Sequence, residues 1–387
     1  MRLSNRGFTL TEVIVVMGIF MTVLMVTSAT FDNVVKQMGQ QSKSAETQIE
    51  GIVGLDVLRA DLEQTGYGLP TVFQGTPAAT EPTLSSITAL SLLWPDGFNP
   101  DTLNDLTSST KSPPRAIEST DTTFNNDGSQ GSKYLVLKST LSGINQAVKK
   151  WSTVSYSGDS KSYQLWDSAE RDLTGSERVI VLKNTFVNGI PQRQLGVNAG
   201  SFYSTFSNLT TLTIPHTDGD IYQVYGVDED TNLRMPFNRA DYYIKSPPSP
   251  LPTCAPNTGT LYKAVASHGS NSFLTMPLLD CVADMQIVYG LDTGNTGLIN
   301  SHTTNLPGTA QDIRDQLKEI RVYILAQEGK KDINFSYPYE EIKVGESFDG
   351  GTTLMGRTFN LKDLIISGWK NYRWKVYTIV VRPKNLL

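Results

Sequence analysis

The stretch Gly7-Phe8-Thr9-Leu10-Thr11-Glu12 opens the part of the chain that decides its fold. From Phe8 to Phe31 there are 24 residues, and Glu12 is the only ionisable side chain among them. A helix of this length rises about 1.5 Å per residue and crosses the roughly 30 Å hydrocarbon core of a bilayer. The sequence therefore predicts a transmembrane helix at residues 8–31.

Glu12 needs a compensating charge, because a carboxylate inside a membrane helix costs on the order of 2.5–3.5 kcal/mol. Cleavage after Gly7 would supply that charge, since Phe8 would become the N-terminus with a free α-amine one helical turn away. The positive end of the helix dipole also favours a carboxylate in the first turn. In an assembly of such helices, Glu12 can pair with a neighbour's Phe8 amine and set the axial register.

These residues resemble the class III signal of type IV pilins and pseudopilins, with Arg6-Gly7 before the cut and Phe8 to Met17 after it. The resemblance implies a leader at residues 1–7, cleavage by a prepilin peptidase between Gly7 and Phe8, N-methylation of Phe8 and an assembly role for Glu12. An ordinary secretory signal or signal anchor is the alternative. It is disfavoured because no A-x-A-like site follows the apolar run and the charged leader is short.

Charge sets the predicted orientation. Arg2 and Arg6 precede the apolar run, so the leader stays in the cytoplasm and the rest of the chain faces outward. The sequence predicts a single-pass membrane protein with its head outside the cytoplasm, and the pilin resemblance implies that this membrane is the inner membrane and that the head lies in the periplasm. The pilin resemblance implies that the protein later moves to a pilus at the cell surface.

Composition favours a β-rich envelope protein. Only 18% of the 387 residues are charged, whereas Gly, Ser, Thr, Asn and Tyr are abundant. The formal net charge is −5, and loss of the two leader arginines makes it more negative. This acidity argues against nucleic acid as a general partner.

The helix is predicted to continue past the membrane as an amphipathic half at residues 32–65. Apolar residues recur there on one face, and Gly66 and Pro70 end the pattern near Thr65. The whole stem would span roughly 87 Å. Three glycines interrupt the stem and mark either bends or close packing: Gly39, Gly51 and Gly54.

The rest of the chain is predicted to be mainly β, giving an α+β fold with a long N-terminal helix packed on an antiparallel β-rich head. Alternating or β-branched runs predict strands at 86–94, 133–140, 148–156, 178–183, 209–215, 221–227, 241–245, 261–266, 285–291, 319–326 and 373–381. The runs at 319–326 and 373–381 both alternate, so we expect them to share one sheet that packs on the stem.

Composition also predicts the domain division. Residues 95–132 are polar and turn-rich, which is typical of a long surface loop, and residues 246–256 form a Pro-rich connector. We therefore expect a head made of residues 66–94 and 257–387, interrupted by a middle insertion or subdomain at 95–256.

Three further segments are similar to minor pilins of the PilW type. They are Leu58 to Gly68 at the end of the stem, Val288-Tyr289-Gly290-Leu291-Asp292, and Val380-Val381-Arg382. This resemblance implies a minor pilin.

The two cysteines, Cys254 and Cys281, are expected to form a disulfide, because the predicted compartment is oxidising. A metal site that adds His268 is the alternative, but no C-x-x-C pair supports it.

Catalysis is not indicated. His216, His268 and His302 are isolated and are interpreted as surface or loop residues, and no nucleophile, zinc or P-loop motif occurs. Asp228, Asp230 and Asn232 alternate as Ca²⁺ ligands do, yet Leu233 and Arg239 occupy the positions where a calcium loop needs Gly and Glu. A solvated acidic turn is the preferred interpretation, and no cofactor is expected.

The C-terminal end is locally basic, with seven basic residues against Asp363: Arg357, Lys362, Lys370, Arg373, Lys375, Arg382 and Lys384. Contact with DNA or an acidic neighbour is one interpretation, and the wet face of a strand is the preferred one.

Together these observations predict a non-enzymatic minor pilin that helps to assemble or initiate a type IV pilus near its tip. Its expected partners are other major and minor pilins, prepilin peptidase, the inner-membrane assembly platform and, before assembly, membrane lipid. Two alternatives are a type II secretion pseudopilin and a pilus-anchored adhesion module that binds a host surface.

Overall fold

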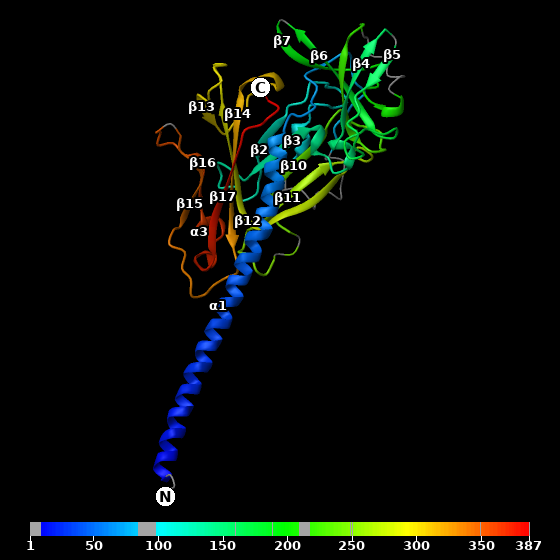
Figure 1. Cartoon of the computed structure of the whole chain (residues 1–387). Helices are drawn as coiled ribbons and strands as arrows, with labels where there is room; N and C mark the ends of the chain where they lie inside the picture. The colour runs from blue at the N-terminus through cyan, green and yellow to red at the C-terminus, as the bar shows by residue number, and fades with distance from the viewer. Residues whose placement is uncertain are drawn as a thin grey trace, which may run out of the picture.

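The computed structural model describes residues 9–83, 98–158, 160–187, 189–208, 217–247, 249, 251–348 and 350–386. It confirms the predicted α+β fold, in which one long N-terminal helix carries a largely antiparallel β-rich head (Figure 1). Five predicted features lie outside the described residues: Gly7, Phe8, His216 and the strands at 86–94 and 209–215.

The helices are α1 (Leu10–Gln64), α2 (Ala310–Gln316) and α3 (Leu361–Leu364). The strands are β1 (Val72–Phe73), β2 (Ile117–Asp121), β3 (Lys133–Ser139), β4 (Trp151–Ser157), β5 (Ser160–Tyr163), β6 (Arg178–Val187), β7 (Ile190–Leu195), β8 (Ser204–Thr205), β9 (Ile221–Asp228), β10 (Asn238–Lys245), β11 (Gly259–Ala266), β12 (Phe273–Leu291), β13 (Ser301–Thr303), β14 (Leu317–Glu328), β15 (Glu341–Glu346), β16 (Met355–Asn360) and β17 (Arg373–Val381).

Two large sheets organise the head. The main sheet has the strand order β17-β14-β12-β11-β10-β3-β2, and β13 pairs with β12. The second sheet has the order β1-β7-β6-β9-β4-β5, and β8 pairs with β6. Strands β15 and β16 form a separate hairpin. The second sheet lies at the end of the head farthest from the N-terminus (Figure 1).

The predicted pairing of the last two alternating runs is confirmed. β14 and β17 pair antiparallel from Ile320 opposite Val381 to Glu328 opposite Arg373. α1 contacts β12, β14 and β17, so the main sheet packs on the stem as expected. Leu55, Leu58 and Leu62 of the stem are buried in the core that this contact creates.

Close backbone approach fixes the stem to the sheet at Gly54. A Cβ atom at this position would lie 2.1 Å from the carbonyl oxygen of Leu278 in β12. About two turns further on, the carboxylate of Asp61 accepts a hydrogen bond from the Tyr242 hydroxyl at 2.5 Å and pairs with Lys263 at 2.5 Å. For Gly54 the open question between a bend and close packing is therefore decided in favour of packing.

The stem ends where the sequence predicts. Thr65 is the C-cap of α1, and Gly66 and Gly68 follow with φ values of 81° and 65°. This left-handed conformation favours glycine. The turn that they form delivers the chain from the stem into β1.

Two predictions about the middle of the chain were wrong. The segment 95–132, expected as a surface loop, contains β2, and Leu103, Leu106 and Ile117 are buried in the core. The insertion expected at 95–256 also supplies β2, β3 and β10 to the main sheet. Within this segment, the strands that belong to the second sheet are β4 to β9.

The physical reason is that sheet membership follows long-range backbone pairing, which local composition does not report. The Pro-rich segment 246–256 likewise connects β10 to β11, which are antiparallel neighbours in the main sheet, and does not lead back from a separate domain.

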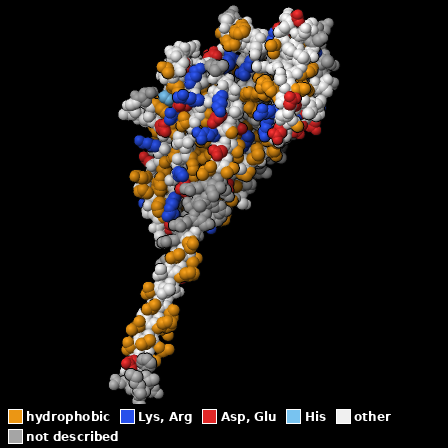
Figure 2. All heavy atoms as spheres, viewed as in Figure 1, with side chains coloured by type: hydrophobic (Ala, Val, Ile, Leu, Met, Phe, Trp, Pro, Cys, Tyr) orange, Lys and Arg blue, Asp and Glu red, His pale blue; other side chains and the backbone are white. Residues whose placement is uncertain are grey.

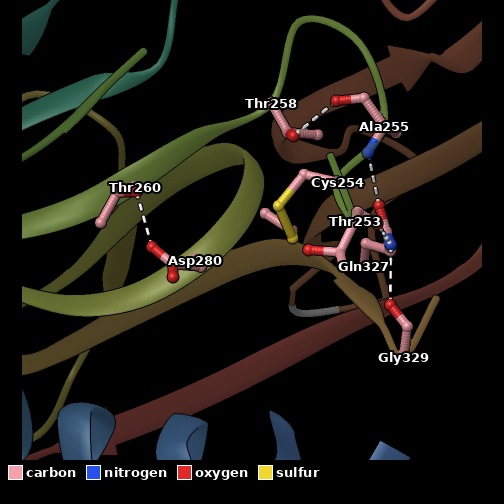
Figure 3. Close-up of a disulfide and its surroundings, with 9 residues drawn as sticks. Thr253, Cys254, Ala255, Thr258, Thr260, Asp280, Gln327 and Gly329 are labelled. Carbon is pink, nitrogen blue, oxygen red and sulfur yellow. Dashed lines mark hydrogen bonds between the residues drawn. A yellow bond between two sulfur atoms is a disulfide. The ribbon is translucent and has the colours of Figure 1, made fainter. Parts of the chain in front are cut away.

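A disulfide joins the segment before β11 to β12. Cys254 and Cys281 are bonded, with their Cα atoms 5.1 Å apart (Figure 3). Beside them the Gln327 side chain of β14 donates to the carbonyl oxygens of Thr253 and Gly329 and accepts from the Ala255 amide. The disulfide therefore lies where three segments of the main sheet meet, and both sulfurs are used without His268.

We expect Gly54→Ala to lower the free energy of unfolding by about 1–3 kcal/mol, because the new methyl group must push the stem away from the Leu278 backbone. Helix propensity acts in the opposite direction by about 1 kcal/mol. Chemical denaturation of the full chain in detergent measures the difference. Gly18→Ala is the matched control, since no atom lies within 4 Å of a Cβ there. A G54A chain as stable as the parent would contradict the close-packed interface.

We expect replacement of both cysteines by alanine to lower the free energy of unfolding by about 2–4 kcal/mol, because the unfolded chain loses a cross-link. Urea denaturation of the full chain in detergent tests this. Reductant should cause a similar loss in the parent and none in the double variant. Unchanged stability of the fully reduced parent would show that the cross-link is dispensable.

Candidate functional site

The first candidate site is the start of α1. Thr9 is the N-cap, and its backbone amide donates to Glu12 Oε2 at 2.8 Å. The Thr9 hydroxyl also donates to Glu12 Oε2 at 2.9 Å, and it accepts a 3.3 Å hydrogen bond from the Glu12 amide. This reciprocal arrangement is a capping box, which satisfies backbone donors that the first helical turn leaves free.

Sequence reasoning singled out Glu12 and missed Thr9. The signal was present as Thr9-Leu10-Thr11-Glu12, which matches the S/T-x-x-E pattern of a capping box. The expected partner of Glu12 was the amine of Phe8, which lies outside the described residues. Before any cleavage the Glu12 carboxylate therefore has a polar environment made by its own helix.

The side chains of the apolar half of the stem are exposed and are not covered by the head. Leu10–Asp32 has a mean hydropathy of 2.3, and none of its most apolar window is buried. Large side chains such as Leu10 and Met25 are 79% and 75% exposed. Figure 2 shows apolar side chains along the part of the stem that projects from the head. A continuous apolar surface of this kind is stable only in lipid or against other protein.

The polar side chains inside this half are satisfied by the helix itself. Thr22, Thr27 and Thr30 donate to the carbonyl oxygens of Ile19, Val23 and Val26 at 2.7–2.8 Å. Hydroxyl groups bonded in this way do not present free donors to hydrocarbon. The segment is thus compatible with a membrane in both its length and its polar groups.

The histidines were interpreted as surface or loop residues, and His268 does lie in the loop between β11 and β12, although it is buried and not at the surface. Its side chain is buried, its Nδ1 accepts from the Arg234 amide, and its Nε2 lies 3.0 Å from Asn238 Oδ1. Burial lowers the pKa of His268 to about 4. His302 stacks on Phe348 with ring centroids 3.9 Å apart.

The acidic turn uses its oxygens internally. Asp228 accepts from the amides of Asp230 and Thr231 and from the Asn145 side chain. The Asn232 side-chain oxygen accepts from Arg178. Across the described ranges, no group of three or more His, Cys, Asp and Glu side chains is arranged to hold a metal ion. These bonds support the interpretation of Asp228, Asp230 and Asn232 as an acidic turn.

The basic C-terminal segment is largely charge-paired. Arg357 is buried and forms a bidentate pair with Asp284 at 2.6 and 2.9 Å, so it does not belong to a wet strand face. Five others have acidic neighbours within 4.0 Å: Lys362, Arg373, Lys375, Arg382 and Lys384. Lys370 lies over the Trp369 ring. This pairing leaves little excess positive charge for binding DNA.

A buried charge cluster was not predicted. Lys138 of β3 is fully buried and contacts Glu81, Asp105 and Glu118 at 3.3, 2.6 and 3.0 Å. Arg239 of β10 is also fully buried and contacts Glu81 at 2.9 Å. These residues are distant in sequence, and no local pattern links them. Removing one partner of such a network leaves a buried charge without a partner.

The remaining members of the cluster are Arg115 and Asp241. Arg115 pairs with Asp105 at 2.7 Å and with Glu118 at 2.6 Å, and Asp241 makes a bidentate pair with Arg239. Four carboxylates thus face three cations. Burial raises the pKa of Glu118 to about 7, even though Lys138 and Arg115 oppose this shift.

This shift makes stability depend on pH. The pKa of Glu118 in the folded chain lies above its ordinary value of 4.5, so folding favours the protonated carboxyl. The contribution of this group to the free energy of unfolding is therefore complete below pH 4.5 and is lost as the pH rises towards 7. We expect the free energy of unfolding to fall by about 2 kcal/mol less between the two pH values in Glu118→Gln than in the parent. Urea denaturation at pH 4.5 and 7.5 measures it. Glu170→Gln, on an exposed loop, is the control, and equal slopes for E118Q and the parent would contradict the assignment.

The comparisons with known proteins agree with the site at the start of the stem. Residues 2–28 match the family model of the prokaryotic N-terminal methylation motif. No curated protein and no solved structure matches the chain. The matched range contains Gly7, Phe8, Thr9 and Glu12 and most of the bare apolar helix.

The motif is that of prepilin-type signals, and the proteins that carry it are structural and not enzymatic. Such a motif implies interaction with prepilin peptidase and with other pilins. Together with α1, the one helix among the described residues that is long and apolar enough to cross a membrane, it supports a membrane-anchored protein of the type IV pilin-like or pseudopilin kind.

Proposed function

We propose that the protein is a minor pilin that is inserted in the inner membrane, cleaved between Gly7 and Phe8, and built into a type IV pilus through its stem. The observation that carries this proposal is the divided helix α1. Its first half is apolar and exposed, and its last turns, which carry the buried residues Leu55, Leu58 and Leu62, are packed into the head. One continuous helix therefore links the exposed apolar anchor to the head.

Processing would change the start of α1 in a specific way. Cleavage would leave Phe8 as a charged N-terminus directly before the N-cap Thr9, whose amide already bonds Glu12. A carboxylate has about four acceptor positions, so Glu12 can accept a hydrogen bond from an amine and keep its hydrogen bonds from Thr9. The amine of the same chain or of a neighbour would then neutralise Glu12 in a low-dielectric environment, where an unpaired charge is costly.

Lateral packing would supply the rest of the assembly energy. Apolar side chains on all sides of the Leu10–Asp32 segment are exposed, so neighbouring stems can replace lipid around the whole helix. We place the head in the periplasm before assembly and on the pilus afterwards. The second sheet adds bulk at the end opposite the stem, which favours a position at or near the tip, where no subunit must pack beyond it (Figure 1).

A pilus-anchored binding module is the second candidate, because strands β6, β7 and β9 of the second sheet line a cavity of about 540 Å³. The PilW type rests on the resemblance of three short segments, and a type II secretion pseudopilin would share the stem features. Surface pili lost in a deletion strain favour the pilus role, whereas intact pili with lost protein secretion favour the pseudopilin.

We expect Glu12→Gln to reduce incorporation into sheared filaments at least about tenfold, because one lost charge pair in a low-dielectric site is worth more than about 1.4 kcal/mol. Immunoblots of sheared filaments against membranes measure the ratio, and mass spectrometry of the N-terminus reports N-methylated Phe8. Asp32→Asn, at the outer end of the apolar segment, is the matched control.

Two outcomes would contradict the proposal. Normal incorporation of E12Q would show that Glu12 does not set the axial register of the assembly. Intact Met1 on chains recovered from filaments would exclude cleavage after Gly7.

A further inference from the structure

A cavity of about 540 Å³ lies at the end of the head opposite the membrane anchor. Four parts of the chain that are remote in sequence line it: the turn after the stem, strands β6, β7 and β9 of the second sheet, helix α2, and the C-terminal tail. Figure 1 shows the C-terminus and β7 at the same end of the head, far from the N-terminus. The volume is in the range of small-molecule sites.

The cavity contains an uncompensated cation. Arg193 of β7 is partly buried, and its guanidinium makes no hydrogen bond or ion pair with the residues that the structure describes. Burial lowers the pKa of Arg193; the nearby Tyr225 opposes this shift, and the positive charge of Arg314 adds to it. Arg314 has its own partners, Asp315 at 3.6 Å and Gln311. Arg193 is therefore the group that lacks an anion.

Two neutral polar groups in the lining are also unsatisfied. The buried Gln192 Oε1 atom is an acceptor with no partner in the described structure, and the buried Asn385 Nδ2 atom is a donor with none. Both side chains line the cavity. Buried polar groups are normally hydrogen-bonded, so an unmatched donor and an unmatched acceptor at one cavity indicate a ligand that offers both.

The walls between these groups are aromatic and apolar. Tyr67 and Tyr225 meet edge to face with ring centroids 5.3 Å apart. Phe186 and Ile190 from β6 and β7 also line the cavity, and their side chains are 75% and 45% exposed. Aromatic rings pack well against the C–H faces of a flat or ring-shaped ligand.

We propose that this cavity binds a carboxylate-bearing saccharide, such as a uronic acid unit of a surface polysaccharide. The carboxylate matches the planar fork of Arg193, the hydroxyl groups both donate to Gln192 and accept from Asn385, and the sugar ring packs on the tyrosines. A neutral sugar would leave Arg193 unmatched. Inorganic phosphate would pair with Arg193 but has no ring to pack on the tyrosines. The proposal does not depend on the role of the stem in a pilus.

Calorimetric titration of the full chain in detergent with glucuronate tests this, with glucose and inorganic phosphate as comparison probes. We expect glucuronate to bind, and Arg193→Gln to weaken its binding at least about tenfold, because a charge-assisted bidentate pair is lost. Arg171→Gln is the matched control, on an exposed loop of the same sheet. It should bind as the parent does.

A second variant and a second measurement guard against misfolding. Asn385→Asp removes the free donor and places a carboxylate against the ligand, so it should weaken binding without touching Arg193. Saturation-transfer NMR on the parent should show the sugar ring protons in contact with aromatic protons.

Three results would overturn the proposal. The first is the absence of glucuronate binding at about 10 mM, a concentration that still reveals very weak sites. The second is equal binding of glucose and glucuronate. The third is phosphate binding as strong as glucuronate binding. Unchanged affinity in a folded R193Q or N385D chain would place any binding elsewhere.

Discussion

The structure depends on the contact between the second half of α1 and the main sheet. The contact is close because Gly54 allows the helix backbone to reach the Leu278 carbonyl, and it is tied by Asp61, which engages Tyr242 and Lys263. A long helix without this attachment would carry an apolar surface with no fixed relation to the head. With it, the exposed apolar half of α1 is joined to the head through one continuous helix.

The head is held by long-range interactions that reinforce this attachment. β12 is 19 residues long and pairs with β11 along its first part and with β14 along its last part, and the disulfide lies at Cys281 between the two. The buried charges of Lys138 and Arg239 join β3 and β10 to the segment after the stem. Such a network stabilises only when every partner is present, so it favours a single arrangement of these segments.

The two candidate sites lie at opposite ends of the molecule and differ in how they are built. The site at the start of α1 is local, because Thr9 and Glu12 are three residues apart, and its pattern is legible in the sequence. The cavity at the distal end joins Tyr67, Arg193, Arg314 and Asn385, which come together only in the folded head. The membrane anchor lies at one end of the molecule, and the cavity that we propose as an anion-binding site lies at the other. This arrangement places the cavity on the face of the head farthest from the membrane.

The sequence by itself determined the stem, its apolar half, its end at Thr65, the disulfide partners and most of the strands, because helix periodicity, glycine caps and strand alternation are local properties of the chain. Only the tertiary structure decided that residues 117–121 form a strand of the main sheet, that His268 is buried and that Lys138 gathers three carboxylates. Each of these depends on which distant segments pair, and the free energy of that pairing comes from burial and hydrogen bonds that no short window of sequence contains.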